Sequence, residues 1–298
     1  MPNIAVVGSI AMDLVAVSNK RPSAGETVIG EAFHTVPGGK GANQAVAAAR
    51  LGSKVAMIGA VGEDSYGNLV RKNLENEGVF VNHVEPVTGS TTGIAHIVLA
   101  EEDNSIIVVQ GANRLVDQHI VDKAEELLIK ADMVVMQLEI PLETVEYVLN
   151  ICNENNIPVM LNPAPAQMLS EEVLNKATYI TPNEHECRIV LNDFTSPLEE
   201  LLAKYPNKLL MTEGGNGVRF HNGEEIVHVP SIAVEVVDTT GAGDTFNGAL
   251  AVALSEGTPL KQAVRFANIA AGLSVTKLGA QGGMPTRERV REVQVIVG

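Results

Sequence analysis

The sequence predicts an α/β protein with an open, mostly parallel sheet, helices on both faces of that sheet, and a small β-sheet that forms a lid. Two observations predict it. Short continuous apolar runs alternate with helical patterns through most of the 298 residues, which is typical of parallel strands buried on both faces. Two regions break this alternation with β-rich segments that no helix separates. We interpret residues 1–298 as one domain, with the lid formed from about residues 12–36 and 92–110.

The expected elements follow from this alternation. The apolar runs predict strands of the main sheet at residues 4–7, 55–58, 133–138, 158–161 and 208–211. Helical spacing between them predicts helices at residues 42–51, 69–77, 142–150 and 198–202, and alanine-rich patterns predict two more at 243–254 and 260–276. The lid segments are residues 14–17, 27–33, 93–99 and 105–109, which we expect to pair as a small antiparallel sheet.

Composition excludes several classes of protein. The chain has 21 Lys and Arg against 36 Asp and Glu, a net charge of −15, and no cationic block. Nucleic acids and anionic membranes demand such a block, so we expect neither as a partner. Cys152 and Cys187 stand alone, which argues against a disulfide scaffold or a zinc site and favours a reducing cytosol. No uncharged run reaches the ~20 residues of a membrane span, and we identify no export signal.

The strongest motif occupies residues 238–248, DTTGAGDTFNG. Apolar residues recur with helical spacing from Phe246 onward, so Gly241 and Gly243 lie at the beginning of a helix. Unpaired amides and the helix dipole favour an anion there, and glycine allows a phosphate to approach the backbone. Asp244 has two interpretations at this point: an ordinary first-turn acidic residue, or a catalytic base beside an anion site.

A second glycine-rich motif, PGGKGANQ, occupies residues 37–44 at the start of another expected helix. Lys40 and Asn43 could donate to a polyol or a phosphate, while the glycines could equally form a tight strand-to-helix turn. The P-loop pattern fails because Gly41 follows Lys40 where Ser or Thr is required, and the dinucleotide pattern fails at Phe246. A classical P-loop protein and a dehydrogenase are therefore disfavoured.

Together, GGKGANQA at residues 38–45 and DTTGAGDTF at residues 238–246 resemble the two signatures of the ribokinase-like (PfkB-type) carbohydrate kinase family. Further matches run along nearly the whole chain: GET at 25–27, MQLE at 136–139, LNPAPA at 161–166, TPNEHE at 181–186 and GAQG at 279–282. The resemblance implies ATP-dependent phosphorylation of ribose at its 5-hydroxyl. It also implies magnesium, activation by potassium, and a homodimer formed through the lid.

The resemblance also assigns residues. Asp244 is implied as the base and the amides of Gly241, Ala242, Gly243 and Asp244 as the anion hole. The implied sugar-binding residues are Ala11, Met12, Asp13, Gly39, Lys40, Gly41, Ala42, Asn43, Glu139 and Asp244. The implied nucleotide-binding residues are Asn183, Glu186, Thr212, Glu213, Gly214, Gly215, Asn216, Gly217, Gly243, Asp244 and Asn268, with Glu186 associated with magnesium and phosphate. The implied monovalent-cation loops contain Asp238, Thr240, Ser274, Lys277, Gly279 and Gly283.

One position departs from the family pattern. Ala11 stands two residues before Asp13, where the family commonly has Asn, so one polar contact to the sugar is lost or comes from elsewhere. The alternatives are therefore a kinase for another small sugar or a nucleoside, and a sugar-binding paralogue without catalysis. The acidic Asp244 beside the glycines argues against the paralogue, since pure binding needs no carboxylate at an anion site.

Overall fold

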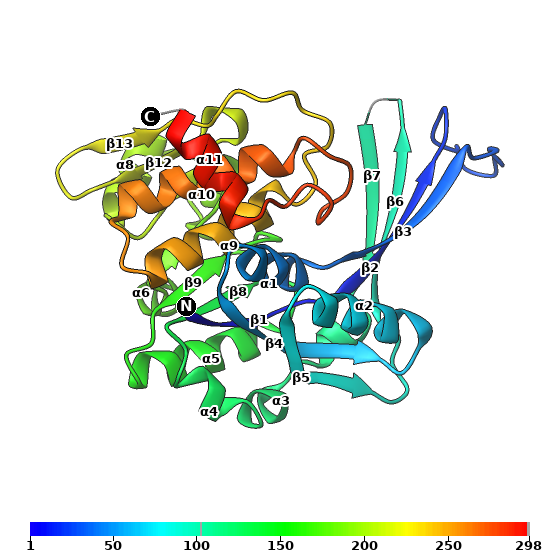
Figure 1. Cartoon of the computed structure of the whole chain (residues 1–298), viewed down its shortest axis with the longest axis horizontal. Coiled ribbons are helices and arrows are strands. Elements are labelled where there is room, and N and C mark those ends of the chain that lie inside the picture. Colours follow the sequence, from blue (N-terminus) through cyan, green and yellow to red (C-terminus); the bar gives the residue numbers. More distant parts are fainter. Residues whose placement is uncertain (102, 297–298) are drawn as a thin grey trace.

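The structure is a computed structural model that describes residues 1–101 and 103–296. Its main sheet has six parallel strands in the order β10-β9-β8-β1-β4-β5 (Figure 1). Their bounds are β1 Asn3–Val7, β4 Lys54–Gly62, β5 Val79–Val87, β8 Met133–Gln137, β9 Val159–Asn162 and β10 Tyr179–Ile180. The expected mostly parallel sheet is confirmed.

Two apolar layers cover the sheet, one on each face. The first layer contains α1 Lys40–Arg50, α2 Ser65–Asn76, α9 Ala242–Ser255, α10 Leu260–Ser274 and α11 Arg287–Ile296. The second contains α3 Gln118–Asp122, α4 Glu125–Leu128, α5 Leu142–Glu154, α6 Glu171–Lys176, α7 Glu184–Val190 and α8 Leu198–Lys204. Within β1, Ile4 and Val6 join the first layer and Ala5 and Val7 the second. Burial on both faces explains why these strands are continuous apolar runs.

The lid is a four-stranded sheet in the order β3-β2-β6-β7 that projects from the body (Figure 1). Its strands are β2 Ala11–Val17, β3 Ala32–Gly38, β6 Gly93–Ala100 and β7 Asp103–Val109. Two expectations need correction. The central pair β2 and β6 is parallel rather than antiparallel, because each follows a strand of the parallel main sheet and leaves the same edge in the same direction. The strand expected at residues 27–33 begins only at Ala32.

The run at residues 208–211 also differs from expectation. Ile180 of β10 donates to the Lys208 carbonyl and accepts from the Leu210 amide, both at 2.9 Å, so this run joins the main sheet only briefly. The chain then forms a three-stranded antiparallel sheet of β11 Met211–Thr212, β12 Val218–His221 and β13 Ile226–Val229, which we did not predict. Short 3-10 turns, η1 Gly111–Leu115 and η2 Gly214–Asn216, complete the elements. None of the helices in the described residues is long and apolar enough to cross a membrane.

Candidate active site

The two glycine-rich motifs meet at the carboxyl edge of the main sheet. The first begins α1 and the second begins α9, and these helices pack so closely that a Cβ on Gly248 would lie 2.7 Å from the Cβ of Ala47. The segments that follow β1 and β8 bring Asp13 and Glu139 to the same place. Ligands of open α/β sheets bind at this edge, and here the edge gathers the residues that both motifs predicted.

Gly39 and Gly41 serve close backbone packing. Gly39 has φ +90°, and a Cβ on it would lie 2.7 Å from the amide nitrogen of Ala11. A Cβ on Gly41 would lie 2.7 Å from the amide nitrogen of Ser9. The chain segments that approach these glycines are therefore residues 8–11 of the protein itself, which favours the tight-turn interpretation for both glycines. Their effect on the site is to bring the start of α1 against the end of β1.

Asp244 lies in the first turn of α9 with its side chain buried. Asn43 Nδ2 donates to Asp244 Oδ2 at 2.9 Å, and Gln44 Nε2 donates to Asp244 Oδ1 at 3.0 Å. Burial raises the pKa of this carboxyl, while nearby Lys40 and the two amide donors act in the opposite direction. A buried carboxylate held by two amides at a helix start is a group whose geometry is fixed before a substrate arrives.

Lys40 lies among several carboxyl groups. Burial opposes its positive charge, but Asp244, Glu139, Glu186 and Asp13 favour that charge, and the pKa of Lys40 is raised. Burial, together with the charges of Glu139 and Asp244, raises the pKa of Asp13 to about 7, against the opposing effect of Lys40. Glu139 Oε2 accepts from the Ser9 hydroxyl and, at 3.2 Å, from the Lys40 amide. The cluster can therefore bind hydroxyl groups through acceptors and phosphate through one ammonium group.

The beginning of α9 supplies amides for an anion. Gly241 has φ +77°, and a Cβ there would lie 2.6 Å from the carbonyl oxygen of Ala280, so glycine is required. Within residues 1–101 and 103–296, the amides of Gly241, Gly243 and Asp244 have no protein acceptor, whereas the Ala242 amide donates to the Thr239 carbonyl at 3.2 Å. Of the four amides in the predicted anion hole, the Ala242 amide already donates within the turn, and the other three are available to an anion.

Asn183 and Glu186 form a capping box at the start of α7. The Asn183 side chain accepts from the Glu186 amide, and Glu186 Oε2 accepts from the Asn183 amide, both at 2.8 Å. These bonds give the pair a structural role that the sequence analysis missed, although the spacing of Asn and Glu is the signal for it. The second oxygen of Glu186 is not used in the box.

The predicted nucleotide loop, residues 212–217, runs from the end of β11 to the start of β12. Its residues Glu213, Gly215 and Asn216 line a cavity of about 600 Å³, together with Arg219, His228, Pro230 and Ser231. Glu213 is held by Arg219, whose Nε donates to Glu213 Oε1 at 2.7 Å. Asn268 is buried, and its amide donates to the carbonyls of Val229 and Pro230 at 2.9 and 3.2 Å. Asn268 therefore supports one wall of this cavity, and its contact with a nucleotide stays a prediction.

The two predicted cation loops lie against each other. Asp238 Oδ2 accepts from the Gly279 amide at 2.8 Å, and its Oδ1 accepts from the Thr240 amide at 2.9 Å. A Cβ on Gly283 would lie 1.8 Å from the carbonyl oxygen of Ser274, so these positions are also adjacent. Lys277 is exposed. The structure thus brings together the loops that carry Asp238, Thr240, Ser274, Gly279 and Gly283.

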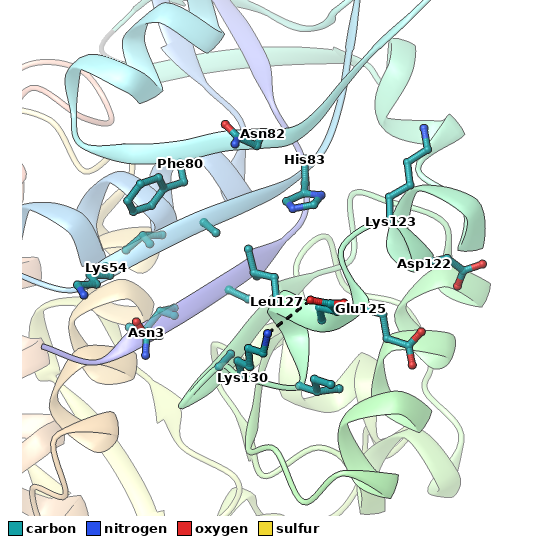
Figure 2. A pocket seen from close by; sticks show the side chains of 17 residues that line it. Asn3, Lys54, Phe80, Asn82, His83, Asp122, Lys123, Glu125, Leu127 and Lys130 are labelled. Atoms are coloured by element: carbon teal, nitrogen blue, oxygen red, sulfur yellow. Dashed lines mark hydrogen bonds and ion pairs between the residues drawn. The ribbon is translucent and has the colours of Figure 1, made fainter.

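A larger cavity, about 970 Å³, lies at the opposite edge of the sheet. It is bounded by the amino ends of β1, β4 and β5 and by α3 and α4, and Figure 2 shows Lys54, Phe80 and His83 along one side of it. The residues of the two glycine-rich motifs do not line it. We therefore place the candidate active site at the carboxyl edge, where both motifs lie, and not in this cavity.

Sequence reasoning missed three glutamines, Gln44, Gln137 and Gln281, that surround Asp244 and Asn43. All three lie inside motifs that the sequence displays, but their partners are 93 to 238 residues away along the chain. Gln44 directly follows Asn43, and that adjacent pair of amides was the available signal.

Comparisons with known proteins agree with this arrangement. The model of the pfkB family carbohydrate kinases matches residues 1–287. A ribokinase of Bacillus subtilis (strain 168) is 57% identical over 293 residues, covering 98% of this chain and 99% of the relative. A deoxyribokinase of Salmonella typhi is 38% identical, covering 97% and 98%. The structure of Arabidopsis thaliana ribokinase complexed with ribose and ATP superposes with a TM-score of 0.89 at 33% identity, covering 98% of each chain. The chain belongs to the pfkB family of carbohydrate kinases.

Proposed function

We propose that this chain is a sugar kinase that transfers the γ-phosphoryl group of ATP to the 5-hydroxyl of ribose. The observation that carries the proposal is the buried Asp244, held by Asn43 and Gln44 beside the free amides of Gly241, Gly243 and Asp244. The ribokinase relative at 57% identity over nearly the whole chain supports it.

In the proposed reaction, the sugar hydroxyl gives its proton to Asp244 as its oxygen bonds to phosphorus. The bond between the γ-phosphorus and the bridging oxygen breaks, and ADP leaves with that electron pair. The transition state is loose, so the proton moves late and a weak base suffices. The amides at the start of α9 and the Lys40 ammonium stabilise charge on the phosphoryl oxygens, because they are oriented before the reaction begins.

Asp13 and Glu139 are proposed to accept hydroxyl hydrogens of the sugar. Since sugar hydroxyls that donate to a carboxylate stabilise its charged form, binding should lower the Asp13 pKa from about 7. We expect sugar binding near pH 7 to release protons and sugar affinity to increase as the pH rises through this range. Calorimetry in two buffers of different ionisation enthalpy measures the release, which should disappear in Asp13→Asn. Release that is absent in the unmodified protein, or that persists in the variant, contradicts the assignment.

The choice of sugar is tested by a panel of ribose, 2-deoxyribose, other small sugars and nucleosides, with ADP formation as the readout. Ribose should give the highest kcat/KM. Ala11 and the deoxyribokinase relative make 2-deoxyribose the second candidate, because Ala11 offers no side-chain hydrogen bond to a hydroxyl. Negligible turnover of ribose beside strong turnover of another acceptor would refute the first choice.

ATP is proposed to bind along residues 212–217 and the cavity beside them, with Asn183 and Asn268 nearby in the chain's nucleotide-binding region. Magnesium commonly binds one or two carboxylates together with substrate phosphates. The unused oxygen of Glu186 fits such a role, because the capping box fixes its side chain. The charge of Glu186 also raises the pKa of Lys40, which connects this carboxylate electrostatically to the cluster around Asp244. Magnesium bound there would neutralise phosphate charge as the phosphoryl group moves.

A potassium ion is proposed to bind between the loops of residues 238–240 and 274–283. The contact of Asp238 with the Gly279 amide and the adjacency of Gly283 to the Ser274 carbonyl bring these loops together, which supports a shared site for one ion. Because Gly241 also packs against Ala280, order in these loops supports the start of α9. Replacing potassium by lithium or choline should lower kcat in the same assay. Equal rates in all three salts would remove these residues from the proposed cation site.

Two copies of the chain are proposed to form a homodimer through their lids. All seven residues of β7 are exposed, including Ile106, Ile107, Val108 and Val109, and β7 is an edge strand. An exposed apolar edge favours association. We expect a dimer in sedimentation velocity and a shift toward monomer in Ile107→Lys, whose side chain is 66% exposed in one chain. A monomeric unmodified protein contradicts the proposal.

A cytosolic location is also proposed, supported by the free thiols of Cys152 and Cys187.

A further inference from the structure

Four amide side chains form two short chains that end on Asp244. We call Asn43, Gln44, Gln137 and Gln281 the amide clamp. Asn43 and Gln44 are the inner members, which donate to Asp244 Oδ2 and Oδ1. Gln281 Nε2 donates to Asn43 Oδ1 at 2.9 Å, and Gln137 Nε2 donates to Gln44 Oε1 at 2.7 Å. Each inner amide therefore accepts at its oxygen from an outer glutamine and donates from its nitrogen to the carboxylate, and the Gln44 nitrogen also donates to Asn162 Oδ1 at 3.0 Å.

This pattern fixes the direction of each inner amide. An amide side chain has a donor end and an acceptor end, and rotation by half a turn exchanges them. When an outer glutamine donates to the inner oxygen, the inner nitrogen must face Asp244. The reverse orientation would place two amide nitrogens against each other and turn an oxygen toward the carboxylate. The outer glutamines thus ensure that Asp244 receives a donor on each oxygen.

The outer glutamines are held in different ways, Gln281 by hydrogen bonds and Gln137 by close packing at the end of β8. Asn73 Nδ2 on α2 donates to Gln281 Oε1 at 2.9 Å, and Arg50 Nη1 donates to the Gln281 carbonyl at 2.6 Å. Gln137 ends β8 and lies over Gly8, where a Cβ would come within 2.0 Å of Gln137 Oε1. Gln137 is 0% exposed and Gln281 is 6% exposed, and both donate to an inner amide rather than to Asp244 itself. Their influence on Asp244 acts through Gln44 and Asn43.

We propose that Gln137 and Gln281 are positioning residues that orient the Gln44 and Asn43 amides toward Asp244, leaving its remaining lone pairs directed at the sugar hydroxyl. This inference rests on the proposed role of Asp244 as the base. It adds that the geometry of the base depends on two glutamines that donate to Gln44 and Asn43 and not to Asp244 itself.

The charges around Asp244 determine what loss of the clamp does. Lys40 on α1 favours the charged form of Asp244, and Glu139 after β8 opposes it. Asp13 on β2 belongs to the same cluster, and Glu186 on α7 acts on Lys40. Donors to a carboxylate favour its charged form. Weakening the clamp should therefore raise the Asp244 pKa, and the acid limb of kcat should move to higher pH.

The test compares Gln137→Met, Gln281→Met and Gln281→Glu. Methionine fills the space without donating. Glutamate keeps the shape of Gln281 and can still accept from Asn73, but it accepts from the Asn43 nitrogen and draws that nitrogen away from Asp244. We expect kcat to fall about tenfold or more in each variant, because small errors in positioning are costly. Gln281→Glu should be the most affected, and sugar affinity should change less than kcat.

Thr144→Val is the matched control. Thr144 is buried and donates to the Val116 carbonyl at 2.7 Å, in the apolar layer that packs α5 against the sheet. Its loss removes one buried hydrogen bond, as Gln137→Met does, and should lower thermal stability. It should leave the acid limb of kcat unchanged. A shift in this control equal to that of the clamp variants would mean that lost stability, and not positioning, causes the shift.

A second readout does not depend on turnover. NMR titration of the Asp244 carboxyl carbon, in protein with labelled aspartate, should show a higher pKa in Gln137→Met and Gln281→Met than in the unmodified protein. An unchanged Asp244 pKa and an unchanged acid limb in both variants would overturn the clamp. Failure of the unmodified protein to phosphorylate any sugar would instead overturn the proposed function, while the titration would still decide the clamp.

Discussion

Asp244→Asn is expected to lower kcat by about 10²-fold or more, the size of general-base effects. Two changes cause this loss. The asparagine cannot take up the hydroxyl proton, and its amide nitrogen must face a donor from either Asn43 or Gln44, both of which now donate to the carboxylate. Sugar affinity should be largely kept, because Asp13 and Glu139 remain. Steady-state turnover and calorimetric sugar binding measure the two quantities separately.

The control for this variant is Glu154→Gln, which removes the same charge from an exposed position at the end of α5. It should leave kcat unchanged. Near-normal turnover in Asp244→Asn would show that this carboxylate is only the first-turn acidic residue of a helix, which was the other interpretation of the sequence.

Lys40→Met should have the second-largest effect. Lys40 lowers the pKa of both Asp244 and Asp13, so without its charge both groups hold protons to higher pH. The variant also loses an ammonium group that stabilises the transferring phosphoryl group. We expect kcat/KM to fall by about 10²-fold or more, since general acid–base and charge effects of this size combine here. The acid limb of the pH profile should move upward.

Two further variants separate charge from packing. Lys40→Arg keeps the positive charge and should keep the acid limb near its original position, even if the larger guanidinium lowers kcat. Lys54→Met removes a lysine from the cavity at the opposite edge of the sheet and should change neither quantity. An acid limb that stays in place in Lys40→Met would contradict the role given to its charge.

The sequence predicts most of the main sheet because burial on both faces produces apolar runs that can be recognised locally, as in residues 4–7 and 133–138. The directions of the lid strands could not be predicted in the same way. The alternation of side chains along β2 and β6 would be the same in a parallel and in an antiparallel pair. The direction of each strand depends instead on the main-sheet strand that precedes it, β1 for β2 and β5 for β6. The hairpin of β12 and β13 escaped notice because each strand has only four residues.

The candidate site shows the same division. Residues of one motif could be read together, so spacing alone predicted the start of α9, whereas it left two interpretations of Asp244 open and the role as base came from the family resemblance. The glycines at 39 and 41 were ambiguous because the sequence does not show what approaches them, and the structure shows backbone of residues 8–11. The bond from Gln281 to Asn43 joins positions 238 residues apart, and only the folded chain reveals it.

The most direct test of the central claim is a crystal structure with ribose and a non-hydrolysable ATP analogue. We expect the 5-hydroxyl oxygen to lie about 2.6–3.2 Å from an oxygen of Asp244. We also expect the γ-phosphate to accept from the Gly243 and Asp244 amides. A complex in which no sugar hydroxyl reaches Asp244, with the phosphate bound away from the start of α9, would contradict it.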